Sequence, residues 1–184
     1  MNKIVLRYGL LAGAILAALV AFVAFGVPFC NIGNFEHSEI FGYSSMVLAF
    51  LLVFFGVRSY RENVGHGAVS FGKALGVGLL IVLIACAMYV ISWEITYFNF
   101  VPDFLDKYNA HMLDKMKASG KSEAEIQEAT VKMAEMAKQY QNPLFNSAIT
   151  FMEVFPVGLI MALVSAAILR RKPRLDVPAE IATA

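Results

Sequence analysis

Four long apolar stretches divide this chain, and they restrict its fold more than any other feature. They cover about residues 8–27, 41–57, 74–98 and 147–169. A helix rises about 1.5 Å per residue, so about 20 apolar residues cross the hydrocarbon core, and the second stretch is only just long enough. Backbone groups in hydrocarbon must pair within their own segment, which helices achieve. The sequence therefore predicts an all-α membrane protein with four transmembrane helices.

The composition supports a membrane location and argues against other classes of protein. Hydrophobic residues make up 59% of the 184 residues and charged residues 16%, which is too little charge for a chain surrounded by water. The net charge is only +1 and no long basic block occurs, so nothing is available to neutralise nucleic-acid phosphates. We expect the lipid bilayer as the main surroundings and no nucleic-acid partner.

The positions of Lys and Arg predict the orientation in the membrane. They occur before the first stretch, between the second and third, and after the fourth, while residues 28–42 contain none. The six basic residues in 99–146 are outnumbered by seven acidic ones. Because positive charge marks the cytoplasmic side, we expect a bacterial inner-membrane protein with both termini cytoplasmic. The first stretch is too long for the core of a signal peptide and is expected to be retained. Residues 1–171 then form one membrane domain, and residues 172–184 form a flexible cytoplasmic tail.

Two helix-packing details are also predicted. The small residues at intervals of four in the first stretch, Gly9, Gly13 and Ala17, share one helix face and favour close contact with another helix. The two cysteines, Cys30 and Cys86, lack a paired spacing and are expected to be small buried apolar residues without a disulfide.

The connection between the third and fourth stretches is predicted to form a helical hairpin at about residues 102–141, outside the membrane. Gly120 suits the end of its first helix, and Ser122 to Glu125 match a capping box for the second. Both helices are amphipathic, and mutual packing is favoured over lying on the bilayer because their polar faces carry both charge signs. The apolar stripes are Leu105, Tyr108, Met112 and Met116, and Ile126, Thr130, Met133, Ala137 and Tyr140.

Two carboxylates lie in the outer halves of the third and fourth stretches. Glu94 follows Trp93 in an aromatic run, and Glu153 precedes Pro156, which is expected to kink its helix. A charged side chain there costs several kcal/mol unless it is paired, protonated or hydrated. Glu94 shares a helix face with small residues such as Gly76 and Ala87, so we expect it to point inward. Without a cation at that depth, at least one carboxylate is expected to hold a proton at neutral pH.

Two interpretations of these carboxylates remain open. In the first, Glu94 and Glu153 form a polar, proton or ion site, with hydrogen-bond partners at Tyr89, Tyr97, Asn146 and Thr150. In the second, which is favoured, Glu153 relieves the backbone defect at Pro156 and Glu94 reaches headgroup water. Local thinning of the bilayer and snorkelling accommodate an isolated carboxylate near a helix end.

No sequence motif indicates an enzyme. The chain lacks a nucleophile elbow, a phosphate loop and paired CxxC motifs, and His37, His66 and His111 lie in different connections. We therefore expect no catalytic residue, no cofactor and no metal. The leading prediction is a non-enzymatic membrane or interaction component, with a homo-oligomer or a membrane protein as partner. The alternative is a small proton- or cation-coupled transporter that uses Glu94 and Glu153.

An ordered set of short motifs extends over nearly the whole chain. It resembles the bacterial membrane family catalogued as domain of unknown function 4199, over about residues 4–171. The resemblance implies a small inner-membrane protein with four spans, and it implies no established activity or site residues. The motifs are Gly42-Tyr-Ser-Ser-Met46, Phe54-Phe-Gly-Val-Arg-Ser-Tyr-Arg61, Phe71-Gly-Lys-Ala74, Trp93-Glu-Ile95, Pro102-Asp-Phe104 with Tyr108, Asn142-Pro143, and Thr150-Phe-Met-Glu-Val-Phe-Pro-Val-Gly158.

Overall fold

The computed structural model describes residues 2–26 and 38–171, and these residues are almost entirely helical. Within them, the only β-structure is an isolated bridge between Val69 and Arg171. Four helices are long and apolar enough to cross a membrane, which confirms the predicted all-α membrane protein with four spans. The elements are α1 (Asn2–Ala21), the π-helical turn η1 (Phe22–Gly26), α3 (Ser38–Asn63), α4 (Phe71–Asn99), α5 (Phe104–Ala118), α6 (Glu123–Tyr140) and α7 (Pro143–Leu169).

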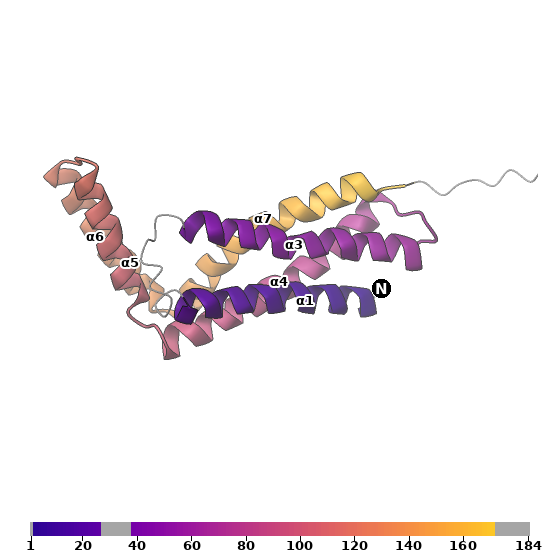
Figure 1. The fold of residues 1–184 in the computed structure, drawn as a ribbon, viewed down its shortest axis with the longest axis horizontal. Coiled ribbons are helices and arrows are strands. Elements are labelled where there is room, and N and C mark those ends of the chain that lie inside the picture. Colours follow the sequence, from indigo (N-terminus) through magenta and orange to yellow (C-terminus); the bar gives the residue numbers. More distant parts are fainter. Residues whose placement is uncertain (1, 27–37, 172–184) are drawn as a thin grey trace, which may run out of the picture.

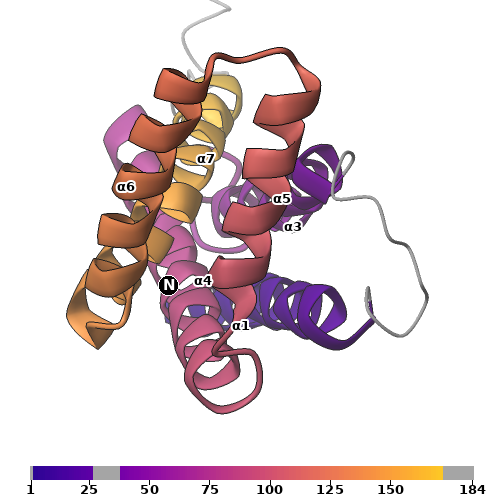
Figure 2. The ribbon, with the colours of Figure 1, turned by 90° about the vertical axis from the view of Figure 1, so that its left-hand side faces the viewer.

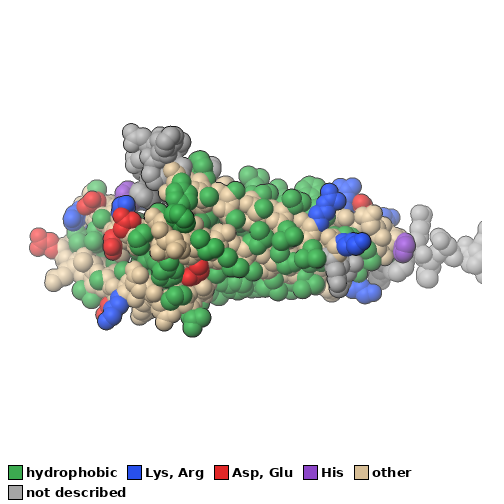
Figure 3. All heavy atoms as spheres, turned by 90° about the horizontal axis from the view of Figure 1, so that it is seen from below, with side chains coloured by type: hydrophobic (Ala, Val, Ile, Leu, Met, Phe, Trp, Pro, Cys, Tyr) green, Lys and Arg blue, Asp and Glu red, His purple; other side chains and the backbone are tan. Residues whose placement is uncertain are grey.

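The four apolar helices α1, α3, α4 and α7 form an elongated bundle, and α5 and α6 project from one end of it (Figure 1). Helix α4 contacts α1, α3 and α7, whereas α3 also packs against α1 and α7. The start of α1 and the end of α7 lie at the end of the bundle away from α5 and α6 (Figure 1). Lys and Arg gather at that end, beyond a belt of hydrophobic side chains (Figure 3). We call it the basic end.

Glycines allow the helices of the bundle to approach closely. A Cβ atom at Gly9 would lie 2.9 Å from the Cβ of Ile84, and one at Gly13 would overlap Met88. The predicted close contact of this face of α1 is therefore confirmed, and its partner is α4. In the same way, a Cβ at Gly158 of α7 would lie 3.0 Å from Phe50 Cζ of α3. Larger residues at these positions would push the helices apart.

Caps outside the apolar runs make the helices longer than the predicted spans. The Ser70 hydroxyl accepts a hydrogen bond from the Lys73 backbone N–H, and Asn142 Oδ1 accepts one from Leu144 N at 3.0 Å. Helix α4 therefore begins at Phe71, and α7 begins at Pro143, where the missing N–H of proline costs nothing. Helix α7 continues through Pro156 to Leu169.

Helices α5 and α6 lie beside each other (Figure 2) and project from the end of the membrane bundle (Figure 1). Gly120, with a φ of +75°, lies just after the end of α5, and the capping box predicted at Ser122 and Glu125 is present at the start of α6. No residue of α5 is buried, and the one buried residue of α6 is Tyr140 at its last position. The pair is thus attached to the bundle chiefly at its base.

Of the two cysteines, Cys86 lies within the described residues. Cys86 is fully buried in α4 and carries a free thiol, as expected. Cys30, His37 and the tail at 172–184 lie outside the described residues.

A candidate site at the junction between the bundle and the α5–α6 pair

Aromatic rings from three helices meet where the α5–α6 pair joins the bundle. The rings of Trp93 and Phe104 are 5.1 Å apart and edge-on, and those of Tyr97 and Tyr140 are 5.3 Å apart and edge-on. Trp93 and Tyr97 belong to α4, Phe104 begins α5, and Tyr140 ends α6. Edge-to-face pairs of this kind add to the effect of burial. We call this cluster, with the polar groups described next, the junction.

A chain of hydrogen bonds runs through the same residues. Trp93 Nε1 donates to the Tyr140 hydroxyl at 3.0 Å, and that hydroxyl lies 3.4 Å from Thr150 Oγ1. Thr150 Oγ1 donates to Asn146 Oδ1 at 3.2 Å, and Asn146 Nδ2 donates to the Tyr140 carbonyl at 3.3 Å. Because Tyr140 accepts from Trp93 and Thr150 donates to Asn146, the Tyr140 proton is directed at Thr150. Asn146 and Thr150 are 0% and 2% exposed, so these partners are essential.

Two further hydrogen bonds join α4 to the segment that begins α7. Gln141 Nε2 donates to the Tyr97 hydroxyl at 3.1 Å. Ser147 Oγ donates to Glu94 Oε1 at 3.0 Å, and Glu94 is half-buried. Of the predicted polar residues, Glu94, Tyr97, Asn146 and Thr150 are therefore each bonded to a neighbouring residue.

The two carboxylates do not form one buried pair. Among the described residues, no hydrogen bond or ion pair joins Glu94 to Glu153, and Glu153 is exposed on α7. Pro156 lies one turn after it within the continuous helix. Tyr89 of α4 is 8% exposed and interacts electrostatically with Glu153 and with Tyr43 of α3. Tyr89 is thus the predicted residue that comes near Glu153, while Glu94 pairs with Ser147.

The small residues that share a helix face with Glu94 do not mark the packed side of α4, although Glu94 itself is half-buried and bonded to Ser147 of α7. Gly76 and Ala87, which share its face, are exposed, and a Cβ added at Gly76 would meet nothing. The reason is that α4 carries small residues on both sides, so their presence does not identify the packed face. The residues that α4 buries are Ala74, Val77, Gly78, Ile81, Val82, Ala85, Cys86, Tyr89, Trp93, Thr96 and Tyr97.

Five residues of the junction are not among the predicted site residues. The sequence patterns place Trp93 in an aromatic run and Tyr140 in an amphipathic stripe. They give no role in a site to Phe104, Gln141 or Ser147. A usable signal was present, because Tyr140 and Gln141 directly precede the Asn142 cap of α7 and so must lie near the end of a membrane helix.

The chemistry of the junction is that of a neutral hydrogen-bonded network. Burial raises the pKa of Tyr140 above its usual range, and the Glu153 and Glu94 carboxylates add to that effect. The phenol therefore stays protonated at neutral pH. Within the described part of the chain, every fully buried side-chain N or O atom has a hydrogen-bond partner, and no three His, Cys, Asp or Glu side chains gather to hold a metal.

Comparison with known proteins places the chain in a family. Neither the curated proteins nor the solved structures include a match to it. A family model described as "Protein of unknown function (DUF4199)" matches residues 7–171, from the first turns of α1 to the end of α7. That range includes all four apolar helices and the α5–α6 pair. The chain therefore belongs to this family, and its own matched range contains the four helices that are long and apolar enough to cross a membrane.

Proposed function

We propose that this protein is a non-enzymatic membrane component that presents its α5–α6 pair to a partner at the membrane surface. One observation carries the proposal: the buried polar groups of the junction are bonded to one another. A transport or catalytic site needs polar groups that remain available to a ligand. At the junction, Trp93, Tyr140, Thr150 and Asn146 instead satisfy each other and hold α6 against α4 and α7.

The surface of the α5–α6 pair supports an interaction role. Its charges form exposed ion pairs within each helix, such as Lys107 with Asp103 and Lys132 with Glu128. Apolar side chains interrupt this charged surface, with Val131 55% exposed and Met136 47% exposed. Mixed charge with single apolar contacts suits a protein partner in water better than a lipid surface, which favours basic faces. The partner would be another membrane protein or a second copy of this chain.

We also propose a bacterial inner membrane, with both termini cytoplasmic and the α5–α6 pair outside. The start of α1 and the end of α7 lie at the basic end (Figure 1). The positive-inside rule assigns such an end to the cytoplasm. The α5–α6 pair would then meet its partner on the opposite side.

A second candidate is a small proton- or cation-coupled transporter that uses Glu94 and Glu153. One observation favours it: Glu153 is an exposed carboxylate inside a membrane helix and accepts no hydrogen bond from any described residue. Tyr89 beside it could relay a proton. A second copy of the chain would have to supply the remaining wall of a pathway.

Site-specific photocrosslinking in living cells tests the leading proposal. A photoreactive residue at Val131, on α6, should give a protein–protein adduct of defined mass. The matched control at Leu163, which is 40% exposed on α7 within the membrane, should give no such adduct. In parallel, purified protein in liposomes with a pH-sensitive dye should show no proton flux. A flux that Glu153→Gln abolishes, together with no adduct at Val131, would replace the interaction role by the transporter.

A further inference from the structure

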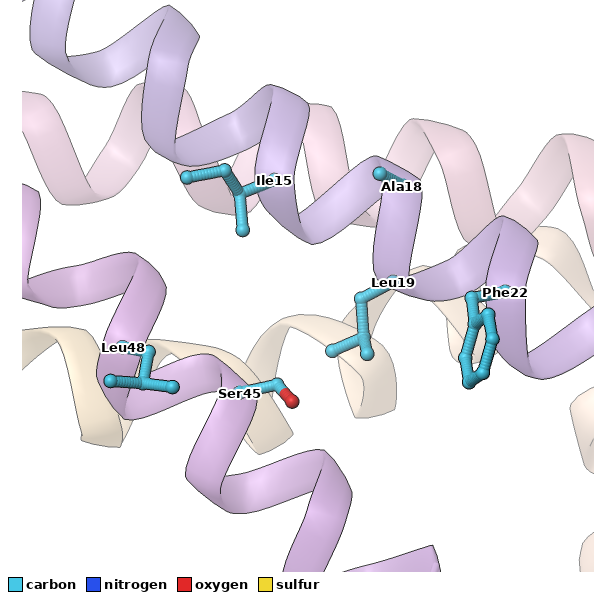
Figure 4. Close-up of a pocket in the computed structure, with 6 residues that line it drawn as sticks. All are labelled: Ile15, Ala18, Leu19, Phe22, Ser45 and Leu48. Atoms are coloured by element: carbon cyan, nitrogen blue, oxygen red, sulfur yellow. The ribbon is translucent and has the colours of Figure 1, made fainter.

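Two hollows lie along the contact between α1 and α3. One has a volume of about 350 Å³ and an almost wholly apolar lining (Figure 4). The other has a volume of about 230 Å³, lies at the basic end and mixes polar with apolar groups. The first is lined by Ile15, Ala18, Leu19, Phe22, Ser45 and Leu48. The second is lined by Tyr8, Phe55, Arg58, Ser59, Glu62 and Asn63.

Both hollows open on the same side of the helix pair. Along α1 and into η1, Tyr8, Ile15 and Phe22 are seven residues apart in turn and so share a face. On α3, the residues with the same spacing are Leu48, Phe55 and Glu62. Ile15, Phe22, Leu48 and Phe55 are 48%, 42%, 65% and 47% exposed, so this side faces the hydrocarbon of the bilayer. We call it the α1–α3 seam.

Tyr8 forms one wall of the polar hollow by packing against α3, and the hollow lies at the membrane boundary. A Cβ at Gly56 would lie 3.2 Å from the Cβ and Cγ of Tyr8, so the absence of a side chain at Gly56 lets Tyr8 rest on the backbone of α3. Arg58 to Asn63 form the last turns of α3, where the membrane span Gly42–Asn63 ends. A ligand in this hollow would thus lie at the level of lipid headgroups.

The hollow is lined by one cation and one anion, Arg58 and Glu62, and Arg61 beside it adds a further positive charge. Arg58 Nε lies 2.9 Å from Glu62 Oε1, and a terminal nitrogen of Arg61 lies 3.2 Å from the same oxygen. Two guanidinium groups thus share one carboxylate, which leaves one unit of positive charge. The terminal nitrogens of Arg58 have no hydrogen-bond partner among the described residues, and the side chain is 53% exposed. A phosphate binds to a guanidinium through such parallel N–H groups.

Charge in the surroundings favours an anion as well. Among the described residues, Glu62 is the one carboxylate in the helix ends that form the basic end, by the bounds of the helices. The other cations of these helix ends are Lys3, Arg7, Lys73, Arg170 and Arg171. The backbone of Arg171 is tied to the connection between α3 and α4 by two hydrogen bonds with Val69, at 2.9 and 3.0 Å. These cations make this end of the molecule positive as a whole, whereas Arg58 is the cation that lines the hollow and can contact an anion directly.

We propose that the α1–α3 seam binds one anionic phospholipid, with its phosphate at Arg58 and an acyl chain extending toward the apolar hollow. A lipid fits because it joins a headgroup phosphate directly to a hydrocarbon chain. From Tyr8 to Ile15 is seven residues, or about 10 Å along a helix, and an acyl chain reaches about 15 Å to the middle of the bilayer. One lipid molecule thus extends from the polar hollow to the near rim of the apolar hollow.

Native mass spectrometry of the full chain tests this site. The protein is released from nanodiscs that contain equal amounts of phosphatidylglycerol and phosphatidylcholine with the same acyl chains. Wild type should retain phosphatidylglycerol preferentially. Arg58→Gln should reduce that preference about tenfold, since charge-assisted hydrogen bonds are lost. The matched control Arg170→Gln removes an exposed cation at the same end that does not line the hollow, and it should keep the preference.

Two further arms address loss of folding and the source of the phosphate. Glu62→Gln removes the carboxylate that both arginines share, so retention of phosphatidylglycerol should increase, a gain that misfolding cannot produce. Excess inorganic phosphate should fail to displace the lipid, because it has no chain for the seam. Equal retention of both lipids by wild type, an equal loss with Arg170→Gln, a loss with Glu62→Gln, or displacement by inorganic phosphate would each overturn the proposal.

Discussion

The two ends of the membrane bundle both carry polar and aromatic side chains, and they use them in opposite ways. At the junction, Trp93, Tyr140 and Asn146 are buried and directed at each other. At the basic end, Arg58 is half exposed and retains N–H groups without a partner among the described residues. At the junction the polar groups are buried and paired within the protein, whereas at the basic end they remain accessible at the level of the lipid headgroups.

This difference shows where ligand chemistry is available in a small membrane bundle. A buried polar atom without a partner costs about 1–3 kcal/mol, so folding selects partners for it within the chain. A polar atom that is paired in this way is no longer available to bind a ligand. A polar group at the membrane boundary keeps contact with water and headgroups, so it stays free to bind. The junction is therefore expected to determine stability, and the basic end to determine lipid recognition.

The largest expected effect is on stability at the junction. Trp93→Ala removes a ring that contacts Tyr97 and Phe104 and the donor to Tyr140. We expect the free energy of unfolding to fall by about 3–5 kcal/mol, as for other large aromatic truncations. Reversible unfolding in mixed micelles measures it. Trp93→Phe keeps a ring and loses the hydrogen bond, which should cost about 1 kcal/mol. Equal stability of the two variants would show that the ring does not hold the junction.

A smaller effect is expected from pH at the same place. Burial raises the pKa of Tyr140 in the folded protein, whereas the unfolded chain releases this proton near pH 10. Tyr140 therefore contributes stability fully below about pH 10, and this contribution is lost as the pH rises through the folded pKa. Unfolding in micelles at increasing alkaline pH should show wild type losing more stability than Tyr140→Phe. Parallel curves for the two proteins would contradict a buried, neutral Tyr140.

Much of the fold follows from local sequence patterns. Apolar length identifies the four membrane helices, and the Ser122 to Glu125 pattern identifies the start of α6, because both depend on neighbouring residues alone. The face of α4 that packs inward could not be derived in this way. It depends on the placement of α1, α3 and α7 around α4, and small residues such as Gly76 and Gly78 occur on both its exposed and its packed sides.

The junction was harder to predict because its contacts are distant in the sequence. Trp93 and Tyr140 are separated by 47 positions, and their hydrogen bond requires α6 to return to the end of α4. The sequence predicts Asn146, Thr150 and Tyr97 as hydrogen-bond partners of Glu94 and Glu153. In the structure these three residues are bonded to Tyr140 and Gln141 instead. Helical periodicity identifies residues that share a face and leaves their partners undetermined.

A still smaller effect on stability is expected at the basic end. Arg58→Gln breaks an ion pair with Glu62 whose side chains are 53% and 46% exposed. Exposed pairs of this kind contribute at most about 1 kcal/mol, and helix pairs four residues apart about 0.3–0.5 kcal/mol. In the assay used for Trp93→Ala, this variant should therefore unfold almost as wild type does. A loss of 2 kcal/mol or more would mean that the basic end is also part of the structural core, and the contrast between the two ends would fail.

The smallest expected effect lies in the capping box of α6, far from the bundle. The Lys121 ammonium group, with hydrogen bonds from Ser122, lowers the pKa of Glu125 from 4.5 to about 2. Because the folded pKa is the lower one, Glu125 stabilises the helix start fully above about pH 4.5, and this is lost as the pH falls through about 2.

Carboxyl carbon NMR of labelled protein in micelles should therefore place the Glu125 midpoint near pH 2. Lys121→Gln should raise that midpoint, whereas Lys138→Gln, at the other end of α6, should leave it unchanged. Global unfolding should barely change in either variant, because the α5–α6 pair is anchored at its base by Tyr140 and not by its caps. If Lys121→Gln destabilised the whole protein as much as Trp93→Ala, the cap and the junction would form one cooperative unit, and the attachment of the pair at its base would have to be abandoned.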